Sequence, residues 1–249
     1  MTSTLVTDDV IDSYRCNGFV QLQSVLTPAE VARYAAAAEA AYASAEGVYT
    51  DAPTFKQMVN RWPVDPVLRE LTFHPALAAA ATRLAGIPLR LWHDQLLMKR
   101  PHNNAATEFH QDAPYWPHDG SRHSLSAWVA LVDVPVERGC MTFLPGQQHR
   151  HDIRPVDLTD RTDLFSVAED LTYLPRVTVP LRAGDVTFHN SYTPHSANPN
   201  ATDQARLAHV VIYADRDLTY NGGAHVCTDQ LDLTVGAPLP DDAFPIISS

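Results

Sequence analysis

The stretch 107–117, which reads T-E-F-H-Q-D-A-P-Y-W-P, determines how the rest of the chain is interpreted. In an extended strand, side chains two positions apart point to the same face, so His110 and Asp112 would present an imidazole and a carboxylate side by side. A 2-His-1-carboxylate triad suits non-haem Fe(II) and leaves three coordination positions open. Such a triad needs one more histidine, delivered from a distant strand.

Taken alone, the H-x-D pair has little diagnostic value. In a chain of 249 residues with 12 histidines, such a pair is expected by chance, and the end of a solvated strand explains it at least as well as a metal site does. Support for a metal site must therefore come from other parts of the sequence.

The length and composition of the chain are typical of a globular enzyme. A chain of 249 residues fits one large domain with a substantial core, and its hydrophobic content is 45%. The formal net charge is −11, and lysine occurs only at Lys56 and Lys99. The absence of a basic cluster from the sequence argues against nucleic acid or an anionic membrane surface as a partner.

The cysteines and the N-terminal residues bear on the cellular compartment. Cys16, Cys140 and Cys227 are odd in number and lack a C-x-x-C pattern, so reduced thiols are expected rather than a disulfide framework or a zinc ribbon. The N-terminal residues lack the apolar core of a signal peptide, and no run approaches the roughly 18 apolar residues of a membrane span. We therefore expect a soluble cytoplasmic protein without a membrane partner.

The first third of the chain predicts mostly helices. Apolar spacing indicates a helix at 8–16. The sequence T-P-A-E at 27–30 combines an N-cap, a proline at the first helical position and a glutamate three residues after the cap, and it begins a helix that runs to about residue 45. Between 47 and 66 prolines interrupt the pattern, and two further helical segments follow at 67–73 and 75–85.

From residue 89 the pattern changes to short strands separated by Gly, Pro and Asn, at the spacing typical of a sandwich or barrel. The polar segment 152–173 predicts a long loop, and the residues after 215 predict a cover over one edge. The fold is therefore predicted to be mainly β, with strands at 89–100, 107–112, 125–134, 141–144, 177–181, 186–189 and 206–214.

A histidine and an arginine further along the chain are candidates to complete a site. His195 follows the predicted strand 186–189, and Arg206 opens the next strand eleven residues later. An antiparallel return would bring Arg206 near the His195 end of the sheet. The planar guanidinium of an arginine binds a carboxylate with two hydrogen bonds and stays charged when it is buried.

The order of an H-x-D pair, a distant histidine and an arginine eleven residues later resembles the phytanoyl-CoA dioxygenase family of Fe(II)/2-oxoglutarate oxygenases. The resemblance covers most of the chain from the N-terminal helix onward. The motifs that carry it are F-K-Q-M-V, W-H-D-Q-L-L-M-K-R-P, H-Q-D-A-P-Y-W-P, A-W-V-A-L-V-D-V, R-G-C-M-T-F-L-P-G-Q-Q-H and G-D-V-T-F-H-N-S-Y-T-P-H-S.

This resemblance implies a double-stranded β-helix, a cupin-like jelly roll with flanking N-terminal α-helices, as a single domain over 1–249. Residues 1–88 would give mostly helical support, 89–215 the jelly-roll core and 216–249 a C-terminal cover. The implied iron ligands and catalytic residues are His110, Asp112 and His195, and Arg206 would bind the distal carboxylate of 2-oxoglutarate. Fe(II), 2-oxoglutarate and O2 would take part in the reaction.

Two further co-substrate contacts are implied by position within similar motifs. Lys56 and Trp128 resemble residues that touch 2-oxoglutarate in relatives. The family often has a serine two residues after the distal histidine, but here that position is Ala197 and the serine is Ser196.

Strand parity adds residues that do not depend on the resemblance. On the strand 89–100, His93 and Gln95 share one face, which we assign to the barrel interior, with Gln95 near the co-substrate and His93 near the substrate. On the last strand, Arg206 and His209 lie on opposite faces. His209 should therefore be a packed histidine and not a ligand.

The implied reaction is oxidative decarboxylation of 2-oxoglutarate to succinate and CO2, coupled to hydrogen abstraction from a small-molecule substrate. Asp112 retains the carboxylate that related halogenases give up for chloride, which disfavours halogenation. Hydroxylation in specialised metabolism is the expected outcome, although desaturation, cyclisation and epimerisation begin in the same way. Tyr115 and Trp116 are candidates for an aromatic substrate wall, and core packing explains them equally well.

Other functions are also compatible with the residues. An acyl-CoA hydroxylase is disfavoured by the few lysines and the acidic charge, because the phosphates of CoA bind to basic patches. A jelly-roll protein that binds a metal or a ligand without redox chemistry, or a Zn-dependent hydrolase, would use the same triad but would have no use for Arg206. The sequence does not indicate an oligomeric state.

Overall fold

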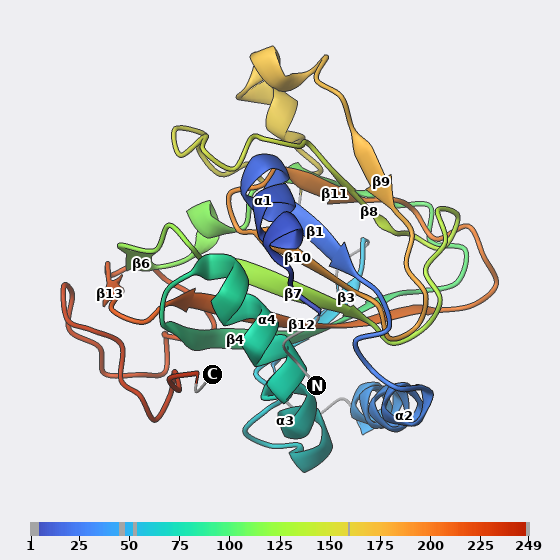
Figure 1. Ribbon diagram of the computed structural model, residues 1–249, viewed down its shortest axis with the longest axis horizontal. Helices are drawn as coiled ribbons and strands as arrows, with labels where there is room; N and C mark the ends of the chain where they lie inside the picture. The colour runs from blue at the N-terminus through green and yellow to red at the C-terminus, as the bar shows by residue number, and fades with distance from the viewer. Residues whose placement is uncertain (1–4, 45–47, 52–53, 159, 248–249) are drawn as a thin grey trace.

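Two antiparallel sheets face each other across the centre of the molecule (Figure 1). The structure is a computed structural model that describes residues 5–44, 48–51, 54–158 and 160–247. The larger sheet has seven strands, in the order β1 (Phe19–Leu22), β10 (Val186–Asn190), β7 (Leu125–Ala130), β12 (Arg206–Asp215), β4 (Leu89–Lys99), β3 (Lys56–Val59) and β2 (Val48–Asp51). The smaller sheet has four, in the order β5 (Thr107–His110), β11 (His195–Ala197), β8 (Met141–Phe143) and β9 (Val177–Val179).

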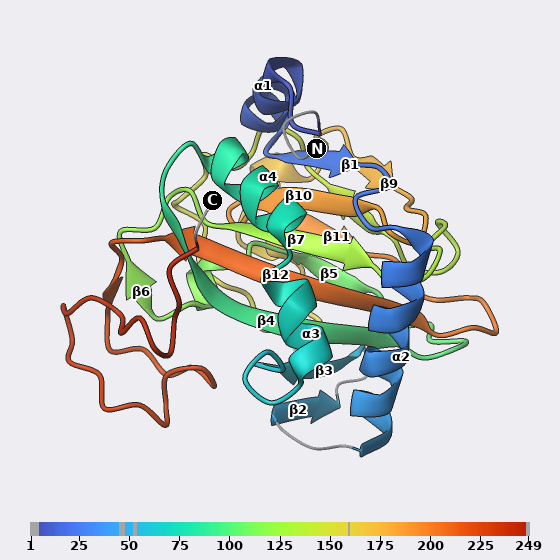
Figure 2. The same cartoon turned by 60° about the horizontal axis from the view of Figure 1, so that its bottom comes forward.

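Helices α2 (Pro28–Ser44), α3 (Pro66–Thr72) and α4 (Pro75–Ala85) cover the outer face of the larger sheet, and α1 (Asp8–Asn17) lies beside β1 (Figure 2). The predicted capping box begins α2, because the Glu30 carboxylate accepts from the Thr27 backbone N–H at 2.8 Å and the Glu30 N–H donates to the Thr27 hydroxyl at 3.3 Å. None of the described helices combines the length and the apolar character that a bilayer crossing requires.

Strand β12 shows how one strand contributes to two separate cores. Leu207, Val211 and Tyr213 pack into the core between the larger sheet and the helices. Val210 and Ile212 pack into the core between the two sheets. Because both faces of β12 are covered, nearly all of its residues are buried.

The remaining elements lie in the connections. The polar segment predicted as a loop contains two short 3-10 turns, η3 (Leu164–Ser166) and η4 (Glu169–Leu171), and a third turn, η2 (Ala113–Tyr115), follows β5. Strands β6 (His118–Asp119) and β13 (Thr219–Tyr220) pair with each other. The C-terminal residues pack against the end of β4, where the Ile247 N–H donates to the Leu89 carbonyl at 2.9 Å.

The predicted mainly β fold with N-terminal helices is confirmed, with two corrections. The segment 47–66 was predicted to lack regular structure, but it contains β2 and β3 at the edge of the larger sheet. The strand predicted at 107–112 is shorter than expected, because β5 ends at His110 and does not include Asp112. The predicted end of the second helix, Ala45, lies outside the described residues, and the division of the chain at 88 and 215 stays a prediction.

His209 lies on the helix side of β12, as parity predicted, and belongs to a buried polar group. Its Nε2 lies 3.0 Å from the hydroxyl of Thr72, and that hydroxyl also lies 2.7 Å from the Asp94 carboxylate. All three side chains are fully buried, and burial lowers the pKa of His209 to about 3. A neutral His209 therefore acts in packing between the sheet and α3.

Replacing His209 with glutamine is expected to lower the free energy of unfolding by about 1–3 kcal/mol, because it disturbs a buried hydrogen bond. The affinity for Fe(II) should stay within twofold of the original, about the precision of a titration, because the ring lies outside the metal site. Chemical denaturation and an Fe(II) titration measure the two effects. A large loss of iron affinity would show that the register of β12 is wrong.

Candidate active site

A cavity of about 280 Å³ lies between the two sheets. Its lining includes His110, Asp112 and His195 at one place and Arg206 with Trp128 at another. These residues come from β5, the turn after it, β11, β12 and β7, so the sandwich brings together side chains that are far apart in the sequence. The cavity is the place where the predicted site residues meet.

His110 and Asp112 converge through a turn and not through strand parity. Asp112 has dihedrals of φ −76° and ψ −46°, in the right-handed helical region, and it begins the turn η2. Its backbone N–H donates to the Ser191 carbonyl at 2.9 Å. The buried Gln111 amide donates to the Tyr192 carbonyl at 2.6 Å. These bonds hold the turn after β5 against the residues that precede β11.

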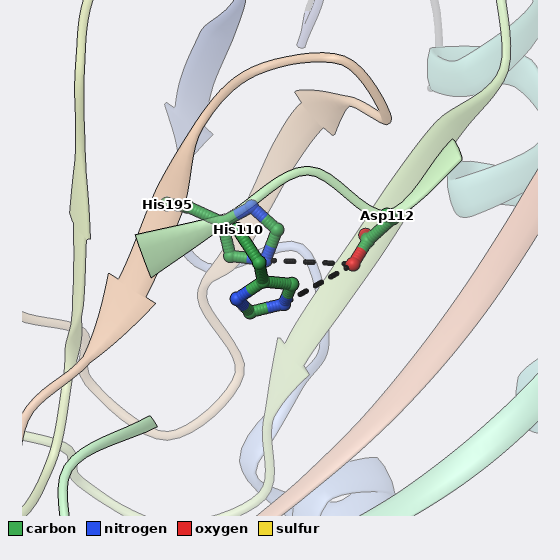
Figure 3. Close-up of side chains that lie close together, drawn as sticks. All are labelled: His110, Asp112 and His195. Atoms are coloured by element: carbon green, nitrogen blue, oxygen red, sulfur yellow. Dashed lines mark ion pairs between the residues drawn. The ribbon is translucent and has the colours of Figure 1, made fainter. Parts of the chain in front are cut away.

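His195 completes a group of three potential metal ligands (Figure 3). In the smaller sheet His195 pairs directly with His110, and their ring centroids are 4.4 Å apart. The Asp112 Oδ1 atom lies 3.4 Å from Nε2 of His110 and 3.7 Å from Nε2 of His195. One ligand atom from each residue lies within 4.8 Å of the others, so the three side chains could hold a metal ion together.

The tautomers of both histidines suit metal binding. Nδ1 of His110 lies 2.7 Å from the Glu108 carbonyl, and Nδ1 of His195 lies 3.0 Å from the Thr193 carbonyl. Each Nδ1 therefore donates to its carbonyl, which leaves the Nε2 atom of each ring, on the side of Asp112, as the atom that would bind a metal. Two imidazole lone pairs and a carboxylate oxygen facing one another attract a cation, and this N,N,O donor set suits Fe(II).

The electrostatics of the three residues also favour a bound positive charge. Burial raises the pKa of Asp112, but the nearby imidazoles of His195, His110 and His189 outweigh this effect and hold the pKa well below its usual range. Burial lowers the pKa of His195 to about 3, so its ring is neutral. Burial lowers the pKa of His110, but Asp112 outweighs this effect and raises the pKa, so a cation would replace a proton on this ring. The ionised Asp112 and the neutral His195 are already in the protonation state that metal ligands need.

Arg206 brings a buried charge without a counter-ion to the same cavity. It is 2% exposed, and no described carboxylate forms a salt bridge with it. Its guanidinium lies over the Trp128 ring, at 5.2 Å from the centroid, and its Nε has no hydrogen-bond partner. Burial lowers the pKa of Arg206 to about 10, so it remains charged at neutral pH.

The spacing between Arg206 and the three ligands fits a dicarboxylate. Ser126 donates to Asp112 Oδ2 at 3.4 Å, and Trp128, two residues along β7, lies beneath the guanidinium. Residues two apart on a strand are separated by about 7 Å. A five-carbon dicarboxylate such as 2-oxoglutarate can therefore reach from the metal ligands to Arg206.

The other predicted residues are placed as follows. Gln95 lines the cavity and donates from its amide to Nε2 of His93 at 2.8 Å, whereas His93 is fully buried behind it and is not among the lining residues. Trp128, Tyr115 and Trp116 line the cavity. The Tyr115 hydroxyl donates to the Val156 carbonyl at 2.7 Å, so only its ring is offered to a substrate.

The structure does not place Lys56 in the site, which corrects the expected co-substrate contact. Its ammonium lies 3.8 Å from the Asp51 carboxylate, at the sheet edge. The neighbouring Phe55 and Gln57 line the cavity, because successive side chains on β3 point to opposite faces.

Sequence reasoning missed several residues that line the cavity. Ser126 on β7 and His189 on β10 are register partners on neighbouring strands, and both side chains lie beside Asp112. His225 reaches the cavity from the C-terminal segment. Parity on β10 would have placed His189 inside, because Phe188 packs on the helix side, but no local signal identifies His225.

Lys99, at the end of β4, is fully buried and contacts the backbone near the start of β5 and at the end of β11. Its Nζ atom lies 3.0, 3.2 and 2.9 Å from the carbonyl oxygens of Ala105, Ala197 and Asn198. Ala197 is the last residue of β11, and Asn198 begins the connection that leads to Arg206 at the start of β12. Burial and the neighbouring Arg206 charge lower the pKa of Lys99 to about 6.

This pKa predicts a pH dependence of stability. Between about pH 6 and 10 the unfolded chain binds a proton at Lys99 that the folded protein does not, so stability should rise with pH, by up to about 1.4 kcal/mol per unit. Denaturation at pH 7 and pH 9 measures the slope, and Lys99→Met should remove this contribution. Equal slopes in both proteins would contradict it.

The family profile described as phytanoyl-CoA dioxygenase matches residues 14–208. A methylphosphonate hydroxylase from Gimesia maris is 27% identical over 95% of this chain and 94% of its own length. The L-proline trans-4-hydroxylase of Streptomyces griseoviridis is 34% identical over 60% of this chain and 63% of that protein. A probable phytanoyl-CoA dioxygenase from Caenorhabditis elegans is 28% identical, and the match spans 53% of its length, so this chain covers about half of that relative.

Two solved structures align with nearly the whole chain. The non-haem α-ketoglutarate-dependent carbocyclase SnoK from nogalamycin biosynthesis is 36% identical, with a TM-score of 0.89, over 99% of this chain and 98% of that one. The epimerase SnoN, in complex with Fe3+, α-ketoglutarate and nogalamycin RO, is 37% identical, with a TM-score of 0.83, over 97% and 98%. α-Ketoglutarate is another name for 2-oxoglutarate, so the SnoN structure holds the iron and the co-substrate that the cavity of this chain fits.

Proposed function

This chain belongs to the phytanoyl-CoA dioxygenase family of Fe(II)- and 2-oxoglutarate-dependent oxygenases, and on that premise we propose that it oxidises a small-molecule metabolite with release of succinate and CO2. His110, Asp112 and His195 would hold Fe(II), and Arg206 would bind the distal carboxylate of 2-oxoglutarate. When bound, the iron and the co-substrate would enable O2 to oxidise the substrate. The side chains place the reactants and exclude water.

The observation that carries this proposal is the buried guanidinium of Arg206. A charged group in a protein interior is costly unless it is paired, and no described carboxylate pairs with it. A dicarboxylate that also reaches the three metal ligands supplies the missing charge. A protein that only bound a metal, or a hydrolase, would gain nothing from this arginine.

The substrate part that enters the cavity is proposed to carry no negative charge. Among the described lining residues, Arg206 is the only cation that is charged at every physiological pH, and the co-substrate occupies it. The remaining wall is aromatic, aliphatic or neutral polar, with Trp116, Tyr115 and His225 beyond the ligands. Burial lowers the pKa of His225, which keeps this ring neutral. Substrates with a carboxylate or phosphonate at the reacting end would lack a partner.

Hydroxylation of a tailoring type is the first proposed outcome, and ring closure or epimerisation is the second. The second is supported by the alignment over nearly the full chain with a carbocyclase and an epimerase at 36% and 37% identity. All three outcomes share hydrogen removal from a substrate carbon and differ in what the substrate does next.

The proposal is tested in two steps. Anaerobic protein with Fe(II) is titrated with 2-oxoglutarate, and the expected result is a charge-transfer absorption that saturates at one equivalent. Succinate formation is then scored for a panel that includes nogalamycin RO, L-proline and methylphosphonate. We expect no stimulation by L-proline or methylphosphonate, which carry a carboxylate and a phosphonate. Failure of Fe(II) and 2-oxoglutarate to bind would exclude the oxygenase function.

A further inference from the structure

The two oxygens of the Asp112 carboxylate have different surroundings. Oδ1 faces the metal-binding nitrogens of His110 and His195, at 3.4 and 3.7 Å. Oδ2 faces away from them, with the Ser126 hydroxyl at 3.4 Å and Nε2 of His189 at 3.5 Å. One oxygen is therefore presented to the metal, and the other lies among groups that can donate hydrogen bonds.

His189 is a buried polar group whose position is explained by Asp112. It is 1% exposed, and neither ring nitrogen has a hydrogen-bond partner. The ring lies between His195, at 4.7 Å between centroids, and Phe143, at 5.5 Å. The 3.5 Å to Oδ2 is longer than a formed hydrogen bond, and such contacts in metal-free sites shorten when the site is assembled.

Strand pairing sets the two donors side by side. His189 on β10 is the register partner of Ser126 on β7, so both side chains reach the cavity at the same level of the larger sheet. Asp112 reaches the same level from the turn after β5, which is fixed by its own backbone bond to Ser191. The donors and the acceptor are thus held by separate parts of the fold.

We infer that His189 and Ser126 are positioning residues that hold Oδ2 of Asp112, so that Oδ1 alone faces the metal. This inference rests on the proposed function. An Asp112 that binds through one oxygen leaves three positions for the two donor atoms of 2-oxoglutarate and for O2. Without the two donors, Oδ2 is free to turn toward the metal and occupy one of those positions.

The test uses His189→Leu, His189→Gln and Ser126→Ala in the full chain, with His209→Gln as the matched control for a buried histidine outside the site. Anaerobic titration is expected to show Fe(II) affinity reduced about 10–100-fold in His189→Leu, as is typical when the partner of a metal ligand is lost. His189→Gln, which keeps a donor, should recover part of the loss, and Ser126→Ala should show a smaller loss.

A second readout separates positioning from a general loss of stability. Absorption of the Co(II)-substituted proteins reports the coordination number, and His189→Leu should shift it while His209→Gln should not. Fe(II) affinity and Co(II) spectra unchanged in all three site variants would overturn the inference, even if the original protein binds Fe(II) and 2-oxoglutarate. If His189→Leu does not fold, the glutamine and alanine variants decide the question. If the original protein binds neither, the proposed function itself has failed.

Discussion

Asp112→Ala is expected to abolish substrate-dependent succinate formation and to weaken Fe(II) binding by more than about 100-fold. Loss of a residue that merely supports a metal ligand costs about 10–100-fold, so loss of the carboxylate itself should exceed that range. The change also leaves two neutral imidazoles facing a divalent cation, with no negative charge to balance it. Anaerobic Fe(II) titration and succinate assays measure the two effects.

The control for this variant is Asp232→Ala, which removes an exposed carboxylate that does not line the cavity. It should retain full Fe(II) affinity and activity. Asp112→Ala should remain folded, because the turn after β5 is also held by the Gln111 amide and by backbone bonds to Ser191. Fe(II) affinity within a few-fold of the original would show that another group supplies the third ligand.

Arg206→Gln is expected to raise the Kd for 2-oxoglutarate by about 100-fold or more, with much less effect on Fe(II). Breaking a buried ion pair costs about 3–5 kcal/mol, and each factor of ten corresponds to about 1.4 kcal/mol. Since no described carboxylate depends on Arg206 in the free protein, the variant leaves no unpaired anion and should fold. Titration of the charge-transfer absorption gives the Kd.

Arg182→Gln is the matched control, since this arginine is exposed and does not line the cavity. It should bind 2-oxoglutarate like the original protein. The Kd of the original protein should also be nearly constant between pH 6 and 8, because the pKa of Arg206, although lowered by burial, is about 10. An unchanged Kd in Arg206→Gln would remove this residue from the co-substrate site.

Local sequence signals predicted the helices and the long strands well. The cap and the glutamate of α2 act through hydrogen bonds three residues apart. The prolines that begin α3 and α4 act through their own fixed φ angle, so these signals are all visible in the sequence. Strands β2 and β3 were not predicted, because each has only four residues and their regularity depends on a partner distant in sequence: β3 pairs with β4, and β2 then pairs with β3. No local pattern encodes that partner.

The candidate site was predicted in its residue types but not in its geometry. His110, Asp112, His195 and Arg206 were all assigned from motif order, and all line one cavity. Strand parity does not explain why His110 and Asp112 lie together. Asp112 lies in a helical turn after β5, and this turn brings its carboxylate to His110. Lys56 was predicted to contact the co-substrate, but its side chain lies on the face of β3 that points away from the cavity. Only the pairing of β3 with β4 decides which face of this short strand meets the cavity.

By itself, the sequence T-E-F-H-Q-D-A-P-Y-W-P with the later histidine and arginine determined the family, the co-substrate class and the ligand types, because these depend on which groups are present and in what order. Only the tertiary structure decided which oxygen of Asp112 meets the histidines, that Arg206 is buried without a counter-ion, and that His189 lies beside the carboxylate. These facts depend on turn geometry and on the register between strands whose residues are up to about eighty positions apart in the sequence. No local propensity specifies distances between such residues.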